Sequence, residues 1–247
     1  MSYEEKHKDE TEFWELFDAA RHMIEGKLAD KFQGRPADKP FSVTRLNSGE
    51  VSPDIVHEWQ RRHFIRVLKL MEKYNIALYE PNYIDFGAQK RQASWTITIT
   101  KRNPRFLTHS GWYEIYIAGL VKKAVNKHRA KQIHELTTGV NLFILNARIT
   151  DVDVMLVLDG HPVYLEVKAK NYINYSPDED MESFVHHVGL FSIPPENACF
   201  VCMNQTENQL EKMRRKVSEQ FKDRFQVCDN NTFSVWIENK VKELAKK

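Results

Sequence analysis

The feature that most constrains the fold is an Asp-Gly pair between two runs rich in Val, Leu and Tyr. Asp-Gly is the preferred two-residue loop of a β-hairpin, because both central residues of this turn need positive φ. We therefore place a turn at Asp159-Gly160. The turn fixes the register of the two strands and sets Asp153 directly opposite Glu166.

The two-residue period of a strand divides this hairpin into two faces. Asp151, Asp153, Glu166 and Lys168 share one face, while the aliphatic residues between them share the other. We expect the aliphatic face to lie in the core and the charged face to carry the chemistry. Lys170 follows on the charged face at the end of the strand.

The opposed acids on the charged face indicate a metal site. Directly opposed residues have Cβ atoms about 4.5–5.5 Å apart, where two like charges destabilise the sheet unless something offsets them. A hard cation such as Mg²⁺ offsets the charge and keeps waters that substrate phosphates can replace. The ammonium of Lys168 could orient a water or stabilise charge on a phosphate. The alternative is a solvated acidic face, with Asp151 serving as the ion partner of Lys168 or as a reserve ligand.

A third acid, Glu114, is predicted near the start of a helix that runs from about Ser110 to Lys127. It continues an otherwise apolar stripe formed by Ala118, Val121 and Val125. A buried carboxylate needs a hydrogen bond, a cation or a metal. The alternative is an acid stabilised by the helix dipole; together with the hairpin, the pattern favours a site.

From Gly111 onward the predicted order of elements is α, β, β, β, α, β, α, β, α. This order resembles the core of the PD-(D/E)XK nuclease superfamily. The matching elements are a helix bearing Glu114, a strand, a hairpin bearing Asp153 and Glu166-Val167-Lys168, and then a helix and a strand. Val152 stands where the family usually has Pro. The resemblance implies an α/β fold with a restriction-endonuclease-like core, in which helices flank a mixed central sheet.

The resemblance also implies phosphodiester hydrolysis with bound Mg²⁺ or Mn²⁺. Glu114, Asp153, Glu166 and the carbonyl oxygen of Val167 would hold the metal, with Lys168 beside them. Within the superfamily, the segments around Glu114, Asp153 and Glu166 are most similar to the nuclease domain of CRISPR-associated, cyclic-oligoadenylate-activated nucleases. The expected function is that of an endonuclease in defence or mobile-element biology. Its expected partner is nucleic acid, with DNA favoured over RNA. Cleavage of both strands would favour a homodimer.

Residues 1–105 are expected to form an N-terminal α+β region, separated from the nuclease domain (106–247) by the basic segment Lys101–Arg105. After a frayed start, the spacing predicts helices over Glu12–Lys31 and Ser52–Tyr74, followed by short strands. These elements suit a winged-helix-like module or an ordinary extension of the domain that follows. No βαβ alternation or Gly-rich phosphate loop is found here, so a nucleotide second messenger is not expected.

Basic residues beyond the hairpin are candidate phosphate contacts, although such runs are commonly solvated faces. They are Lys122, Lys123, Lys127, His128, Arg129 and Lys131 after Glu114, and Lys212, Arg214, Arg215 and Lys216 on a later helix. Two other function classes remain open: a non-catalytic nucleic-acid-binding or assembly subunit, and a toxin-like effector that a partner or ligand releases. The complete acidic set argues against the first.

The composition, with 42% hydrophobic and 28% charged residues, is that of a globular protein. No segment approaches the ~18 apolar residues that a membrane helix needs, and the N-terminus lacks the apolar stretch of a secretory signal. We therefore expect a soluble, cytoplasmic protein without a membrane partner. The three cysteines are too few for a disulfide framework, and Cys199 and Cys202 are expected in a core strand.

Overall fold

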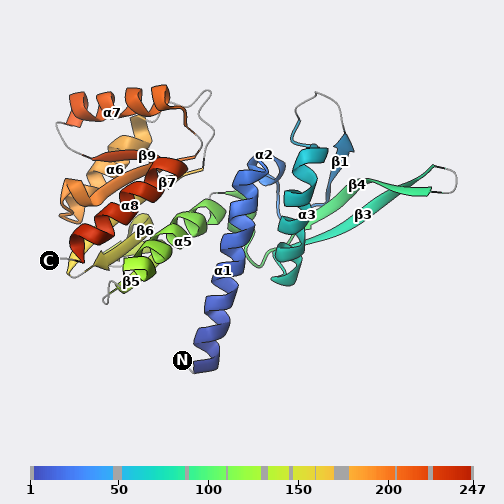
Figure 1. The fold of residues 1–247 in the computed structure, drawn as a ribbon, viewed down its shortest axis with the longest axis horizontal. Helices are drawn as coiled ribbons and strands as arrows, with labels where there is room; N and C mark the ends of the chain where they lie inside the picture. Colours follow the sequence, from blue (N-terminus) through green and yellow to red (C-terminus); the bar gives the residue numbers. More distant parts are fainter. Residues whose placement is uncertain are drawn as a thin grey trace. The chain divides into compact units, whose positions relative to one another are not determined.

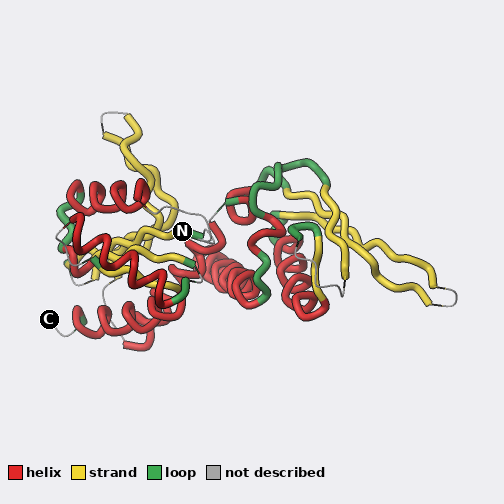
Figure 2. The backbone as a smooth tube through the Cα atoms, turned by 90° about the horizontal axis from the view of Figure 1, so that it is seen from above, coloured by secondary structure: helices red, strands yellow, loops and turns green. Residues whose placement is uncertain are grey.

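The computed structural model describes residues 3–46, 52–86, 89–109, 111–128, 133–144, 147–158, 160–169, 178–203, 205–221 and 225–245. The chain forms two compact units, Met1–Tyr116 and Ile117–Lys247, which Figures 1 and 2 show with their helices and strands. The division falls inside helix α5 (Gly111–His128), on the C-terminal side of the basic segment at which the sequence places a boundary.

The first unit begins with two helices where the sequence predicts one. α1 (Tyr3–Glu25) includes the charged start that was expected to fray, and α2 (Ala29–Phe32) follows it. The helix ends because Lys27 adopts a left-handed conformation, with φ 50°. Directly before it, Gly26 lies so close to the next long helix that an added Cβ would be 2.7 Å from the Cβ of His63.

The second predicted helix is shorter than expected, and its first residues form a strand. β2 (Ile55–His57) pairs in parallel with β1 (Phe41–Leu46), and only then does α3 (Glu58–Lys73) begin. His57 and Gln60 form a capping box at the start of α3. The prediction failed because a Ser-Pro-Asp sequence is a common helix start, whereas the strand depends on pairing with a distant segment.

The sheet of the first unit has the order β2-β1-β4-β3. β3 (Ala77–Phe86) and β4 (Gln89–Ile99) form one long antiparallel ribbon, visible in Figures 1 and 2, where the sequence suggests three short strands. Phe64 of α3 packs edge-on against Trp95 of β4, with ring centroids 5.1 Å apart. Among the described residues between β1 and α3 the chain forms the strand β2, and the winged-helix-like interpretation of this region stays a prediction.

The second unit has the predicted order of elements. Its elements after α5 are β5 (Ile133–Ile144), β6 (Ala147–Leu158), β7 (His161–Lys168), α6 (Asp178–Leu190), a 3₁₀ turn (Pro195–Asn197), β8 (Ala198–Cys202), α7 (Glu207–Phe221), β9 (Gln226–Asp229) and α8 (Asn230–Leu244). The sheet order is β5-β6-β7-β8-β9, antiparallel from β5 to β7 and parallel from β7 to β9. The expected α/β class, with a mixed sheet flanked by helices, is confirmed.

Both faces of the sheet are buried along β8 and from Val163 to Val167 of β7, which corrects the expectation that one hairpin face would be core and the other chemistry. On one face Tyr164 and Phe200 pack with Phe184 of α6 and residues of α7. On the opposite face Leu165 and Val201 have no exposed surface. Parallel strands need cover on both faces, so the carboxylates lie at the end of a covered face and not on an open one.

The hairpin register is the predicted one over the described pairs. Leu158 pairs with His161, and the ladder continues through Val154 and Leu165. Gly160 has φ 80°, the left-handed conformation that the turn requires, while Asp159 lies outside the described residues. A turn signal two residues long therefore predicted the register of the five residue pairs between β6 and β7.

Two expectations from composition concern the cysteines and the membrane. Cys199, Cys202 and Cys228 form no disulfide and are buried, and the burial of Cys199 and Cys202 in a strand was predicted. Within the described part of the chain, no helix combines the length and the apolar character needed to cross a bilayer.

Candidate active site

The acidic site of the second unit lies where β6 and β7 stop pairing. The ladder ends at Val154 and Leu165. One residue further, Oδ2 of Asp153 accepts a hydrogen bond from the backbone N–H of Val167, at 2.8 Å. Asp153 is thereby fixed against the strand that carries Glu166.

Glu166 is buried, with 5% of its surface exposed. Its Oε1 accepts a hydrogen bond from Nζ of Lys168 at 2.5 Å, and its Oε2 accepts one from the hydroxyl of Tyr164 at 2.6 Å. A buried ionised carboxylate is stable only when it is paired and hydrogen-bonded. These two donors meet that requirement and hold both oxygens in place.

The carboxylates around Lys168 favour its charged form. Burial acts to lower the pKa of its ammonium, but the charges of Glu166 and Asp153 outweigh burial and raise the pKa above its usual value. Its Nζ also lies 3.7 Å from Oδ1 of Asp180 on α6. In this protonated form Lys168 can donate hydrogen bonds and stabilise negative charge. The expected ion partner, Asp151, is described only in its backbone, which pairs with Asn141.

A chain of hydrogen bonds links Glu166 to Tyr164 and Tyr164 to His187. Nδ1 of His187 lies 3.1 Å from the hydroxyl oxygen of Tyr164. A tyrosine hydroxyl has one proton, and here it is donated to Glu166, so Nδ1 of His187 must be the donor to Tyr164. This hydrogen-bond chain was not predicted from the sequence. Tyr164 could have been found two positions before Glu166 on the same face, but the approach of His187 depends on the packing of α6.

Glu114 lies in the first turn of α5 with 7% of its surface exposed. Ala118, Val121 and Val125, which complete its predicted stripe, are also buried. Glu114 belongs to the unit Met1–Tyr116, whereas the two hairpin carboxylates belong to the unit Ile117–Lys247. The assembly of all three acids into one site stays a prediction.

The candidate phosphate contacts divide into three groups. On α5, Lys122 is half-buried and Lys123 is exposed. Other members form surface ion pairs, such as Lys127 with Glu238 at 2.6 Å and Arg214 with Glu207 at 2.8 Å, as solvated faces do. Lys170, Arg129 and Lys131 lie outside the described residues, as does the side chain of Lys216.

Comparison with known proteins gives structural similarity without sequence similarity. No protein-family model and no curated protein sequence matches the chain. The solved structure of protein VC1899 from Vibrio cholerae is similar with a TM-score of 0.53 and 15% identity, over 96% of this chain and 56% of that one. Can2 from Sulfobacillus thermosulfidooxidans, solved in complex with cyclic tetra-adenylate, has a TM-score of 0.48 and 13% identity, with the same coverage.

This chain therefore spans little more than half the length of either protein. At such low identity the similarity to VC1899 shows a shared fold and nothing further. The similarity to Can2 is too weak to carry an argument.

Proposed function

We propose that this chain is a metal-dependent nuclease that hydrolyses phosphodiester bonds. The observation that carries the proposal is the arrangement at the end of the β6–β7 hairpin. Asp153 is fixed to the backbone of Val167 at 2.8 Å, and the buried Glu166 is held by the Lys168 ammonium at 2.5 Å. Two carboxylates and a cation on one sheet face are the groups that phosphate chemistry requires.

The donor set fits a hard divalent cation such as Mg²⁺ or Mn²⁺, which prefers oxygen ligands. Each carboxylate oxygen has two lone pairs, so Asp153 and Glu166 can accept hydrogen bonds and bind a metal at the same time. These two residues and the carbonyl oxygen of Val167 would hold the ion, with Glu114 as a further proposed ligand. When bound, the ion stabilises charge on a phosphoryl oxygen and lowers the pKa of a coordinated water.

The residues around the carboxylates have distinct roles in this proposal. An ammonium has three N–H donors, so Lys168 can bind Glu166 and a non-bridging phosphate oxygen at once and stabilise the charge that develops there. His187 and Tyr164 keep Glu166 in one orientation, since the hydroxyl is 2.6 Å from its Oε2. They act as positioning residues and touch no substrate atom.

DNA is the proposed substrate ahead of RNA, and the proposed setting is defence or mobile-element biology. Both rest on the resemblance of the hairpin motif to PD-(D/E)XK nucleases. Lys122 and Lys123 on α5 are the described candidates for contacts with the nucleic-acid backbone.

The test is cleavage by the purified chain of single- and double-stranded DNA and RNA, in Mg²⁺, Mn²⁺ or EDTA. Asp153→Asn, Glu166→Gln and Lys168→Met are compared with Glu182→Gln, an exposed acid on α6. We expect cleavage that needs the metal, is lost in the three site variants and survives in the control. Cleavage that persists in EDTA or in Glu166→Gln would overturn the proposal. Binding of nucleic acid without cleavage of any substrate would favour the non-catalytic subunit.

A further inference from the structure

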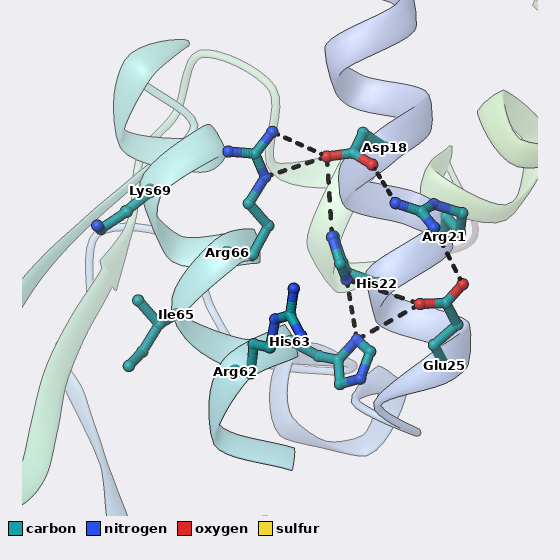
Figure 3. A pocket seen from close by; sticks show the side chains of 9 residues that line it. All are labelled: Asp18, Arg21, His22, Glu25, Arg62, His63, Ile65, Arg66 and Lys69. Carbon is teal, nitrogen blue, oxygen red and sulfur yellow. Dashed lines mark hydrogen bonds and ion pairs between the residues drawn. The ribbon is translucent and has the colours of Figure 1, made fainter. Parts of the chain in front are cut away.

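Two histidines and a glutamate meet between α1 and α3 of the first unit (Figure 3). The Nδ1 atoms of His22 and His63 are 2.8 Å apart. Oε2 of Glu25 lies 3.8 Å from the first Nδ1 atom and 3.6 Å from the second. The three groups border a cavity of about 640 Å³.

Helix geometry and close packing bring these groups together. His22 and Glu25 are three residues apart on α1 and so lie on one face of the helix. His63 approaches from α3 because Gly26 has no side chain, and because the side-chain amide of Gln60 donates to the carbonyl of Gly26 at 2.8 Å. The sequence gives no sign of this meeting, since His22 and His63 are 41 positions apart.

The spacing of the three ligand atoms suits a tetrahedral ion. Zn–N bonds of about 2.0–2.1 Å at tetrahedral angles place neighbouring ligand atoms about 3.3 Å apart. The two distances from Glu25, 3.8 and 3.6 Å, are slightly longer than this, and the distance between the imidazoles is slightly shorter. The two imidazoles are at hydrogen-bond distance, and a bound ion would replace that hydrogen bond.

Two charged residues lie beside the three candidate ligands. Oδ2 of Asp18 lies 3.8 Å from Nε2 of His22, the ring atom that faces away from Glu25. Histidines that bind metals commonly present their other ring nitrogen to a carboxylate. Arg21 contacts Oε1 of Glu25 at 3.3 Å, which turns Oε2 toward the imidazoles.

We propose that His22, Glu25 and His63 bind a borderline transition-metal ion of the Zn²⁺ class through two imidazole nitrogens and one carboxylate oxygen. Three protein ligands leave a fourth position for water or an anion, and the cationic Arg62 and Lys69 that line the cavity favour an anion. The ion would join α1 to α3. It would differ from the ion proposed at the hairpin, because Mg²⁺ prefers an all-oxygen site.

The experiment measures Zn²⁺ binding to the full chain by competition with a chromophoric chelator, in excess Mg²⁺ to occupy the carboxylate site. Co²⁺ is then used as a spectroscopic probe. Glu25→Gln and His63→Gln are compared with His186→Gln, which alters an exposed histidine on α6. We expect the wild-type chain and His186→Gln to bind one more Zn²⁺ ion than the two site variants, and to give the visible absorption of tetrahedral Co²⁺.

Two further variants separate a ligand role from a structural one. Asp18→Asn should keep the stoichiometry but weaken Zn²⁺ binding about 10- to 100-fold, as loss of an outer carboxylate does. Asp153→Asn should leave Zn²⁺ binding unchanged. Glu25 has a side chain that is 42% exposed, so its substitution should leave the helices folded, which circular dichroism in EDTA checks. If folded Glu25→Gln and His63→Gln bind Zn²⁺ as the wild-type chain does, the proposal is wrong.

Discussion

The backbone N–H of Val167 donates to the carboxylate of Asp153 at 2.8 Å, so the strand that carries one acid of the proposed site also positions the other. The contact lies one residue beyond the last paired residues of β6 and β7. Asp153 therefore has a structural role in addition to its proposed role as a metal ligand. The two roles can be separated by substitution.

Asp153→Asn keeps an oxygen that can accept the Val167 N–H but removes the negative charge. We expect cleavage to be lost while the free energy of unfolding in EDTA changes by less than about 1 kcal/mol. Asp153→Ala should lose cleavage and also about 1–3 kcal/mol, because it leaves a backbone donor unpaired. Urea unfolding of both variants checks this, and equal destabilisation by Asn and Ala would contradict it.

Tyr164→Phe removes a hydroxyl from a residue with no exposed surface. Oε2 of Glu166 and Nδ1 of His187 both lose their described partner, so we expect a cost of about 1–3 kcal/mol. Metal affinity at the hairpin should fall about 10- to 100-fold, as for other residues that orient a ligand. Tyr83→Phe, at a residue that is 58% exposed, is the matched control and should change neither the unfolding midpoint nor the binding isotherm.

The sequence was sufficient to predict those features of the fold that are determined by residues close together in the chain. The Asp-Gly turn predicted a register that holds to Val154 and Leu165, and the apolar spacing after Gly111 predicted the order of helices and strands. Both depend on residues close together in the chain. The PD-(D/E)XK-like motif places the proposed site at the end of the hairpin where the ladder stops, and that site stays a prediction.

The remaining features depend on contacts between distant segments. β2 exists because Ile55 pairs with Thr44, and neither residue indicates this alone. The approach of His187 to Tyr164 requires α6 to pack on the sheet. The meeting of His22 and His63 requires two helices to approach at a glycine. The periodicity of apolar residues shows which face of a helix or strand is buried, but it does not show which other element packs against that face.

The hydrogen bonds of Glu15 on α1 with Lys73 and Tyr74 at the end of α3, called the clasp below, should make the stability of the first unit depend on acid pH. Oε2 of Glu15 accepts hydrogen bonds from Lys73, at 2.5 Å, and from Tyr74. These bonds hold the pKa of Glu15 below its usual 4.5, against the opposite effect of burial. A lowered folded-state pKa gives stability that is fully present above the unfolded pKa and is lost as pH falls through the folded one. Below about pH 4.5, the urea midpoint of the wild-type chain should fall more steeply than that of Glu15→Gln; parallel curves would refute the clasp.

The same clasp should also lose stability at alkaline pH, through the tyrosine hydroxyl. Burial, and then the hydrogen bond to Glu15, raise the pKa of Tyr74 above its usual 10.0. A raised folded-state pKa gives stability that is present below the unfolded pKa and is lost as pH rises toward the folded one. Between about pH 9 and 11 the wild-type chain should lose stability relative to Tyr74→Phe. Thermal unfolding across this range, with Tyr83→Phe as control, measures the difference.

Gly160→Ala measures what the turn conformation contributes to stability, because the φ of 80° at Gly160 is a conformation that residues with a side chain avoid. An added Cβ would meet no atom within 4 Å, so Gly160→Ala should cost only the conformational energy, about 1–2 kcal/mol. Gly189→Ala is the matched control, since that helical glycine also has open space around it and alanine there should be neutral or stabilise the chain by up to about 1 kcal/mol. Equal urea midpoints for the two variants would show that the turn conformation contributes nothing to the hairpin. Gly160→Ala should retain full metal-dependent cleavage, because the ladder still aligns the strand of Asp153 with that of Glu166 once the chain is folded.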